Sequence, residues 1–171
     1  GSTVLNGGRI DTTGAQTYLD RVQLGADTTI NAGDSLQFAD TVNGGHALTV
    51  NAGSAYFNSA LGGSERLGAL VINSQGPVAM SGAITAASLT TDAGGTLAIS
   101  GGAVNTTGAQ SYGERVAFGA STVLTGTTVA LNRGADSSPA GHDLTVNGNF
   151  STGAALRTYG EFRNVNVAGS S

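Results

Sequence analysis

The stretch Leu48-Thr49-Val50-Asn51-Ala52-Gly53 alternates apolar and polar side chains, then ends on an amide and a glycine. Two later stretches have a similar form and follow at spacings of 22 and 19 residues: Leu70-Val71-Ile72-Asn73 and Leu89-Thr90-Thr91-Asp92-Ala93-Gly94. Alternation with a period of two, bounded by turn residues, predicts a short strand. The sequence therefore predicts one such strand about every 20 residues.

Strands that return at this period favour an all-β fold, the right-handed parallel β-helix or β-solenoid, with about 20 residues per coil. A helical spacing of apolar residues does not persist, and 28 glycines interrupt the 171-residue chain. We expect Asn51, Asn73 and Asp92 to stack as a ladder at one turn, and the glycines that follow, Gly53 and Gly94, to be left-handed. The residues expected to point inward are Val22, Leu24, Ile30, Leu36, Phe38, Leu48, Val50, Leu70, Ile72, Leu89, Leu97, Ile99, Val116, Phe118, Leu124, Leu131, Leu144 and Val146.

A longer repeat contains the shorter one. Residues 1–31 match residues 95–125 with 14 identities, and Thr12-Thr13-Gly14-Ala15-Gln16 falls on Thr106-Thr107-Gly108-Ala109-Gln110. Further on, residues 45–51 match residues 141–147 at an offset of 96 rather than 94. We therefore divide the chain into a first repeat unit, 1–94, and a second unit, 95–171, which is shorter by about one coil.

Composition excludes several classes of protein. Charged residues make up 11% of the chain and its net charge is −4, and the seven basic residues, all arginines, are too few for a nucleic-acid-binding face. No apolar run is long enough to insert into a membrane as a helix. The chain has no cysteine, which rules out disulfides and thiolate metal sites. It also lacks a basic-then-apolar leader, and we expect it to be an internal segment of a larger protein.

Catalytic signatures are absent from the sequence. No two glycines are separated by a single residue, which excludes the dinucleotide-binding loop, and a chain without lysine has no Walker loop. His46 and His142 occupy equivalent repeat positions and should lie several coils apart, too far to share a metal ion. We expect no enzyme activity, no catalytic, cofactor or metal residues and no cofactor.

Carboxylate pairs on adjacent coils are the one feature of the sequence that could support enzyme activity. Asp20 with Asp40, and Asp11 with Asp34, are conceivable pairs for a carbohydrate-active β-helix. These acids are not clustered with others, and they are more typical of solvated turns.

Tyr18 and Arg21 recur as Tyr112 and Arg115. They suggest either a patch on which a carbohydrate stacks or a brace for the same loop in each unit. The brace is the favoured interpretation, with the tyrosine ring packed and the arginine paired to Asp20 or Glu114. No ligand-binding residue is assigned.

The string from Thr12 through Ile30, followed by residues 45–53 and 67–73, resembles the tandem repeats of very large secreted bacterial adhesins. These are the filamentous haemagglutinin-like exoproteins of two-partner secretion and their autotransporter relatives. The resemblance covers most of residues 1–150 and implies a β-helical shaft outside a Gram-negative cell. It transfers no catalytic residue.

From this resemblance we expect a structural stalk and adhesion module of a large secreted bacterial surface protein, with a role in attachment, aggregation or biofilm matrix. An extracellular polysaccharide or a cell-surface receptor is the expected partner. The alternatives are a self-assembling extracellular filament or sheath subunit, joined end to end, and a carbohydrate-active β-helix enzyme.

Overall fold

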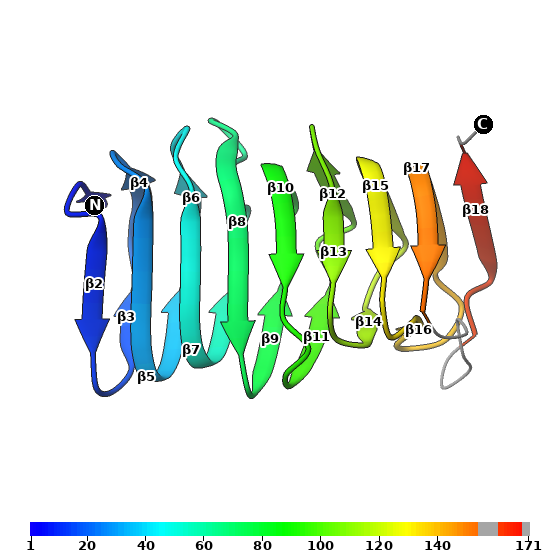
Figure 1. Cartoon of the computed structure of the whole chain (residues 1–171), viewed down its shortest axis with the longest axis horizontal. Coiled ribbons are helices and arrows are strands. Elements are labelled where there is room, and N and C mark those ends of the chain that lie inside the picture. Colours follow the sequence, from blue (N-terminus) through cyan, green and yellow to red (C-terminus); the bar gives the residue numbers. More distant parts are fainter. Residues whose placement is uncertain (154–160, 169–171) are drawn as a thin grey trace.

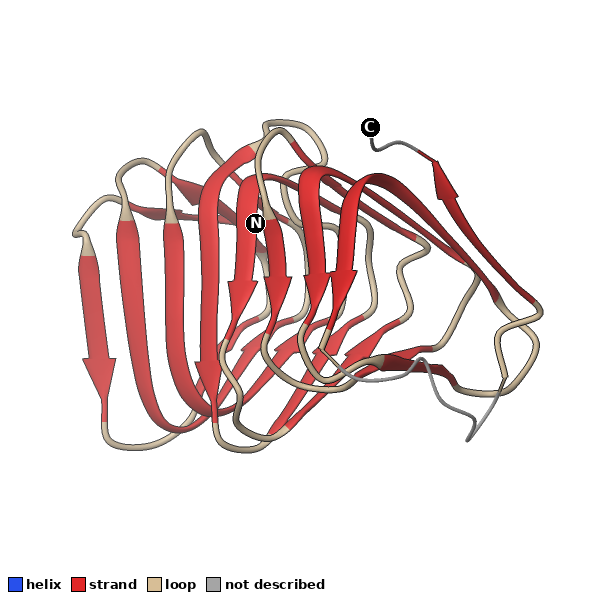
Figure 2. Cartoon of the chain, turned by 45° about the vertical axis from the view of Figure 1, so that its right-hand side comes forward, coloured by secondary structure: helices blue, strands red, loops and turns tan. Residues whose placement is uncertain are grey.

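The computed structural model describes residues 1–153 and 161–168. Throughout this part the regular elements are β-strands, and no helix occurs among the described residues (Figure 2). The strands wind into a parallel β-solenoid of about 8 coils with about 20 residues per coil. The predicted all-β solenoid is therefore confirmed, and Figure 1 shows the coils side by side along the long axis.

Each coil crosses three faces of the rod. The first face carries β1 (Ser2–Leu5), β4 (Arg21–Leu24), β6 (Val42–Asn43), β12 (Ala103–Thr106), β18 (Asn164–Ala168) and the first residues of β10 (Ile84–Thr91), β15 (Thr122–Leu131) and β17 (Asp143–Thr152). The second carries β2 (Arg9–Thr12), β8 (Leu67–Ser74), β13 (Gln110–Tyr112), the first parts of β5 (Thr28–Phe38) and β7 (Leu48–Phe57), and the last residues of β10, β15 and β17. The third carries the ends of β5 and β7 with β3 (Gln16–Tyr18), β9 (Pro77–Met80), β11 (Thr96–Ile99), β14 (Val116–Phe118) and β16 (Ala135–Ser137).

Within the described residues, parallel pairing joins successive coils on each face. On the first face, Val22 pairs with Val42, Leu61 bridges Val42 to Ile84, and the row then continues through β12, β15, β17 and β18. The backbone hydrogen bonds of one coil are thus satisfied by the coil beside it. One coil alone would leave these groups unpaired, so stability depends on stacking.

The core is a thin column inside the three faces. All the residues predicted to point inward are buried, so that prediction is confirmed. Aromatic rings stack along the third face, with centroids 5.0 Å apart for Tyr18 and Phe38 and 5.7 Å apart for Phe38 and Phe57. Other core positions were not predicted from the sequence, namely Ala32, Val42, Ala55, Phe57, Leu61, Leu67, Val78, Met80, Ile84, Ala86, Val104, Tyr112, Val129 and Ala135.

Two turn glycines differ from expectation. Gly53 and Gly94 do not have positive φ, so the prediction of left-handed residues there is wrong. Glycine is needed there because the neighbouring coil comes close: a Cβ on Gly53 would lie 2.6 Å from the carbonyl oxygen of Asp34, and one on Gly94 would lie 2.7 Å from that of Ser74. Close backbone approach, not backbone handedness, selects glycine at these corners.

The long sequence repeat changes face between its two copies. Gln16–Tyr18 lies on the third face, where β3 pairs with β5. The matching segment, Gln110–Tyr112, lies on the second face, where β13 pairs with β10 and β15. One repeat unit therefore spans a non-integral number of coils, and the second copy is turned by one face relative to the first.

Candidate functional site

A groove of about 640 Å³ lies on the first face near the N-terminal end of the rod. Its floor is formed by outward-facing residues of the first three coils, which come from β1, β4 and β6. A loop from the fourth coil closes one side. The lining residues are Ser2, Val4, Arg21, Val22, Gln23, Thr41, Asn43, Gly63 and Ser64.

The loop over the groove is residues 62–66, here called the strap. It leaves the first face after Leu61 and returns at Leu67, so that Leu61 and Leu67 pair with Ile84 and Ala86 respectively. The strap starts at Gly62, whose φ is +70°, and a Cβ there would lie only 2.0 Å from the carbonyl oxygen of Thr85. Both observations require glycine at the base of the strap.

Polar contacts hold the strap along the rod axis. Gln23 Nε2 donates to Glu65 Oε2 over 2.8 Å, across two coils, and the backbone N–H of Ser64 donates to Asn43 Oδ1 over 2.9 Å. In the other direction, Arg66 Nη1 donates to the carbonyl oxygen of Ala86 over 2.8 Å. The strap therefore ties the second coil to the fifth and gives the groove a fixed wall.

The groove presents two rows of outward side chains in strand register. Ser2 pairs with Arg21, and Val4 pairs with Gln23, which in turn pairs with Asn43. Neighbouring members of a row stand about 4.8 Å apart, because that is the spacing of adjacent strands. The rows combine a guanidinium, two amides and hydroxyls with an apolar floor, a set suited to hydroxyl-rich or carboxylate-bearing ligands. This site was not predicted from the sequence; the signal was the five-residue strap, which lengthens one coil.

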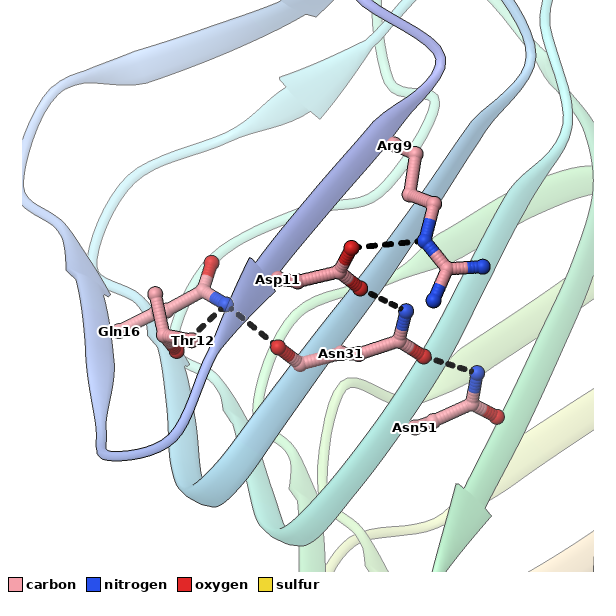
Figure 3. A network of polar contacts seen from close by, with 6 residues as sticks. All are labelled: Arg9, Asp11, Thr12, Gln16, Asn31 and Asn51. Carbon is pink, nitrogen blue, oxygen red and sulfur yellow. Dashed lines mark hydrogen bonds and ion pairs between the residues drawn. The ribbon is translucent and has the colours of Figure 1, made fainter.

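A ladder of amides follows the end of the second face (Figure 3). Asn73 Nδ2 donates to Asn51 Oδ1 and Asn51 Nδ2 donates to Asn31 Oδ1, each over 2.7 Å. Asn31 Nδ2 donates to Asp11 Oδ1 over 2.5 Å, and Arg9 Nε donates to Asp11 Oδ2 over 2.7 Å. The predicted pairing of Asn51 with Asn73 is confirmed, and the ladder runs on toward the N-terminal end.

Asp92 does not continue this ladder as predicted. Its carboxylate accepts a hydrogen bond from the backbone N–H of Ser74 over 3.2 Å. An aspartate carries no donor with which to continue a chain of amides, so the row of side-chain bonds described here ends at Asn73.

The motif Thr-Thr-Gly-Ala-Gln-x-Tyr forms the same corner in both repeat units. In the first unit, Gln16 Nε2 donates to Thr12 Oγ1 and to the carbonyl oxygen of Asn31, each over 2.9 Å, and Tyr18 donates to Gln16 Oε1 over 3.1 Å.

In the second unit, Gln110 Nε2 donates to Thr106 Oγ1 over 3.3 Å and to the carbonyl oxygen of Thr125 over 2.9 Å. Tyr112 donates to Gln110 Oε1 over 2.8 Å, and its side chain is fully buried. Each glutamine thus joins its corner to the next coil. Both tyrosines donate to the glutamine of their own corner, as the brace interpretation expects, and the Tyr112 ring is fully buried.

The predicted partner of the repeated arginine is wrong in the second unit. Arg115 pairs with Asp136 of the next coil, not with Glu114 beside it in the chain. Both residues lie in the bend between β13 and β14, where Glu114 is 1% exposed and Arg115 reaches across to Asp136 of the next coil. In the first unit, Arg21 lines the groove.

The two histidines lie at corners of different faces. His46 Nδ1 stands 3.5 Å from Asp27 Oδ1, just before β7 enters the second face. His142 precedes β17 on the first face. Their surroundings give no metal site, since no group of three or more potential ligands occurs among residues 1–153 and 161–168.

The acids considered for catalysis make polar contacts with other residues, although Asp20 and Asp40 occupy equivalent corners of adjacent coils. Asp11 belongs to the amide ladder, and the Arg9 guanidinium, followed by the Asn31 amide, lowers its pKa. Asp20 and Asp40 are at the corners that precede β4 and β6, and Asp40 caps the backbone N–H of Thr41 over 2.6 Å. These contacts are those of turn residues.

Within the described part of the chain, no helix is long and apolar enough to cross a membrane. Comparisons with protein-family models, with curated proteins and with solved structures found no match to this chain. The class of protein is therefore defined by the fold alone: a parallel β-solenoid.

Proposed function

We propose that this chain is a stalk and adhesion module of a large secreted bacterial surface protein, located outside the cell. The observation that carries the proposal is the parallel pairing of successive coils on three faces of the described chain, which on the first face narrows to single bridges at Leu61. Backbone hydrogen bonds between coils run along the rod axis, so bending the rod requires their distortion. The shape supports a spacer that holds a surface at a distance from its anchor.

The groove on the first face is the proposed contact for an extracellular polysaccharide. Each row contributes one side chain from each coil, so its members follow one another along the rod axis. This arrangement suits a linear polymer that lies along the same axis. Arg21 can hold a carboxylate in bidentate fashion, and the amides of Gln23 and Asn43 can donate to and accept from hydroxyls. An acidic polysaccharide is therefore favoured over a neutral one.

The test is binding of alginate and of dextran to the purified chain, with Arg21→Ala and a control, Arg9→Ala, on the second face. We expect alginate binding that is lost in Arg21→Ala and kept in the control, and weaker binding of dextran. Equal binding by both variants would overturn the groove as the adhesive surface. New reducing ends after incubation would instead favour the carbohydrate-active enzyme.

A second candidate function is end-to-end assembly into an extracellular filament. Among the described residues, β18 pairs only with β17, and Val165 and Val167 are 40% and 43% exposed although they align with buried residues of β17. At the other end, β1, β2 and β3 each pair on one side only. Open strand edges of this kind can join to another copy. Electron microscopy at rising protein concentration separates the two functions, because only a filament subunit would form fibres.

A further inference from the structure

Two carboxyl groups, each with one buried and unsatisfied oxygen, lie on the fifth and sixth coils at the corner between the second and third faces. Asp92 follows β10, and Glu114 stands between β13 and β14. Glu114 is 1% exposed, although glutamate is rarely buried in a thin core. No part of the amide ladder, the groove or the proposed adhesive function uses this pair.

Each carboxyl group has one satisfied oxygen and one unsatisfied oxygen. Thr91 Oγ1 donates to Glu114 Oε2, and the backbone N–H of Ser74 donates to Asp92 Oδ2. The remaining oxygens, Glu114 Oε1 and Asp92 Oδ1, are buried and accept no hydrogen bond. Two ionised carboxylates left in this way would destabilise the fold through desolvation and mutual repulsion.

The charged neighbours do not neutralise the pair. Arg133, from the turn of the seventh coil, uses Nη1 to donate to the carbonyl oxygen of Ala93 over 3.1 Å. Arg115 is held outward by Asp136. Burial raises the pKa of Glu114, and the charge of Asp92 raises it further, while the hydrogen bond from Thr91 lowers it.

We propose that Asp92 and Glu114 hold a single proton between them and so form a pH-sensitive lock between two adjacent coils. With the proton on Glu114, its O–H donates to Asp92 Oδ1, and both unsatisfied oxygens gain a partner. Loss of the proton to water leaves two negative charges facing each other at the corner. The lock is therefore closed in acid and weakened as the pH rises.

The sign of the pH dependence follows from the raised pKa of Glu114. The stabilisation is fully present below the pKa of an unfolded glutamate, about 4.3, and is lost as the pH rises through the folded value. The melting temperature should fall by about 3 °C for each unit by which the folded pKa exceeds the unfolded one.

The variant Glu114→Gln tests the lock, because its amide accepts from Thr91 and donates permanently to Asp92. We expect the wild-type melting temperature to fall between about pH 4.5 and about pH 8, and that of Glu114→Gln to show no such fall, so that the variant melts higher at the alkaline end. The matched control is Glu161→Gln, an exposed glutamate, which should behave as wild type. A Glu114→Gln protein that keeps the wild-type slope would overturn the proposal.

Two further measurements keep the proposal testable if the variant folds poorly. The infrared band of a protonated carboxyl group should persist to higher pH in the wild-type protein than after Asp92→Asn, whose amide donates to Glu114 and lets it ionise. Calcium chloride added at about pH 8 should not change the melting temperature. A rise that is lost in Glu114→Gln would show that the pair binds a cation instead of sharing a proton.

Discussion

Tyr18 and Tyr112 hold the same place in the sequence repeat but lie on different faces of the rod. Tyr18 pairs with Phe38 on the third face, and Tyr112 pairs with Thr91 and Leu131 on the second. Their local contacts are nevertheless alike, since each donates its hydroxyl to a glutamine two residues earlier. The motif therefore specifies a kind of corner and not a particular side of the solenoid.

Removal of the Tyr112 hydroxyl should weaken the fold more than removal of the Tyr18 hydroxyl. Tyr112→Phe takes the donor from Gln110 Oε1 in a fully buried corner, and we expect a loss of about 1–2 kcal/mol in the free energy of unfolding. Tyr18→Phe affects a side chain that is only half-buried, in contrast to the fully buried Tyr112, so its cost should stay below about 1 kcal/mol. Urea denaturation of both variants measures the difference, and equal losses would contradict it.

The conformation of the strap should require glycine at Gly62 but tolerate alanine at Gly63. Gly62→Ala places a Cβ 2.0 Å from the carbonyl oxygen of Thr85 at a positive φ, and we expect a loss of about 2–4 kcal/mol. Gly63→Ala is the matched control, because its nearest contact would be Ala60 Cβ at 3.5 Å. Thermal unfolding compares the two variants; a tolerated Gly62→Ala would mean that the strap can leave the fourth coil by another path.

Removal of a middle member of the amide ladder should lower the stability of the fold, because two side-chain hydrogen bonds are lost at once. Asn51→Ala breaks the bonds to both Asn31 and Asn73, and we expect a loss of about 1–3 kcal/mol in the free energy of unfolding. The control is Asn58→Ala at an exposed position. Urea denaturation of both variants should separate them clearly, and a control as costly as Asn51→Ala would show that the ladder adds little.

The contribution of Asp143 to stability should depend on pH in the opposite sense to that of Glu114. The Arg163 guanidinium lowers the pKa of Asp143, so this contribution to stability is present above the unfolded value, about 3.9, and is lost as the pH falls through the folded value. Arg163→Gln should return the pKa of Asp143 toward its ordinary range. Carboxyl chemical shifts followed by NMR during an acid titration measure this, and an unchanged pKa in the variant would contradict the assignment.

Periodicity was sufficient to predict the solenoid and its core, because each strand shows its inward residues by simple alternation. Leu48, Val50 and Ile72 are examples of such positions, and all are fully buried. The turns were harder to predict. Gly53 looked like a left-handed residue, but its need for glycine comes from Asp34, a residue of the preceding coil that no local pattern reveals.

The groove and the carboxyl pair could not be predicted for a related reason. Gln23 and Glu65 are separated by 42 residues and meet because the strap runs back across two coils. Glu114 was expected to pair with Arg115 from adjacency alone, whereas in the bend between β13 and β14 Glu114 is buried and Arg115 pairs with Asp136 of the next coil. Contacts along the rod axis depend on the exact length of every coil between them, which the repeat alone does not give.

The change of face between repeat units can be measured directly, because the chain has no native cysteine to compete with introduced spin labels. Labels at Thr17→Cys and Ala117→Cys would both lie on the third face, five coils apart, at a backbone separation of about 24 Å. Ser111→Cys lies in the same coil as Ala117 but on the second face. The distance from Thr17 to Ser111 should therefore exceed the distance from Thr17 to Ala117, because it includes the crossing between faces. Pulsed electron–electron double resonance measures both distances. If the repeat units were instead in phase, Ser111 would align with Thr17 along the axis, and the distance from Thr17 to Ser111 would be no longer than the distance from Thr17 to Ala117.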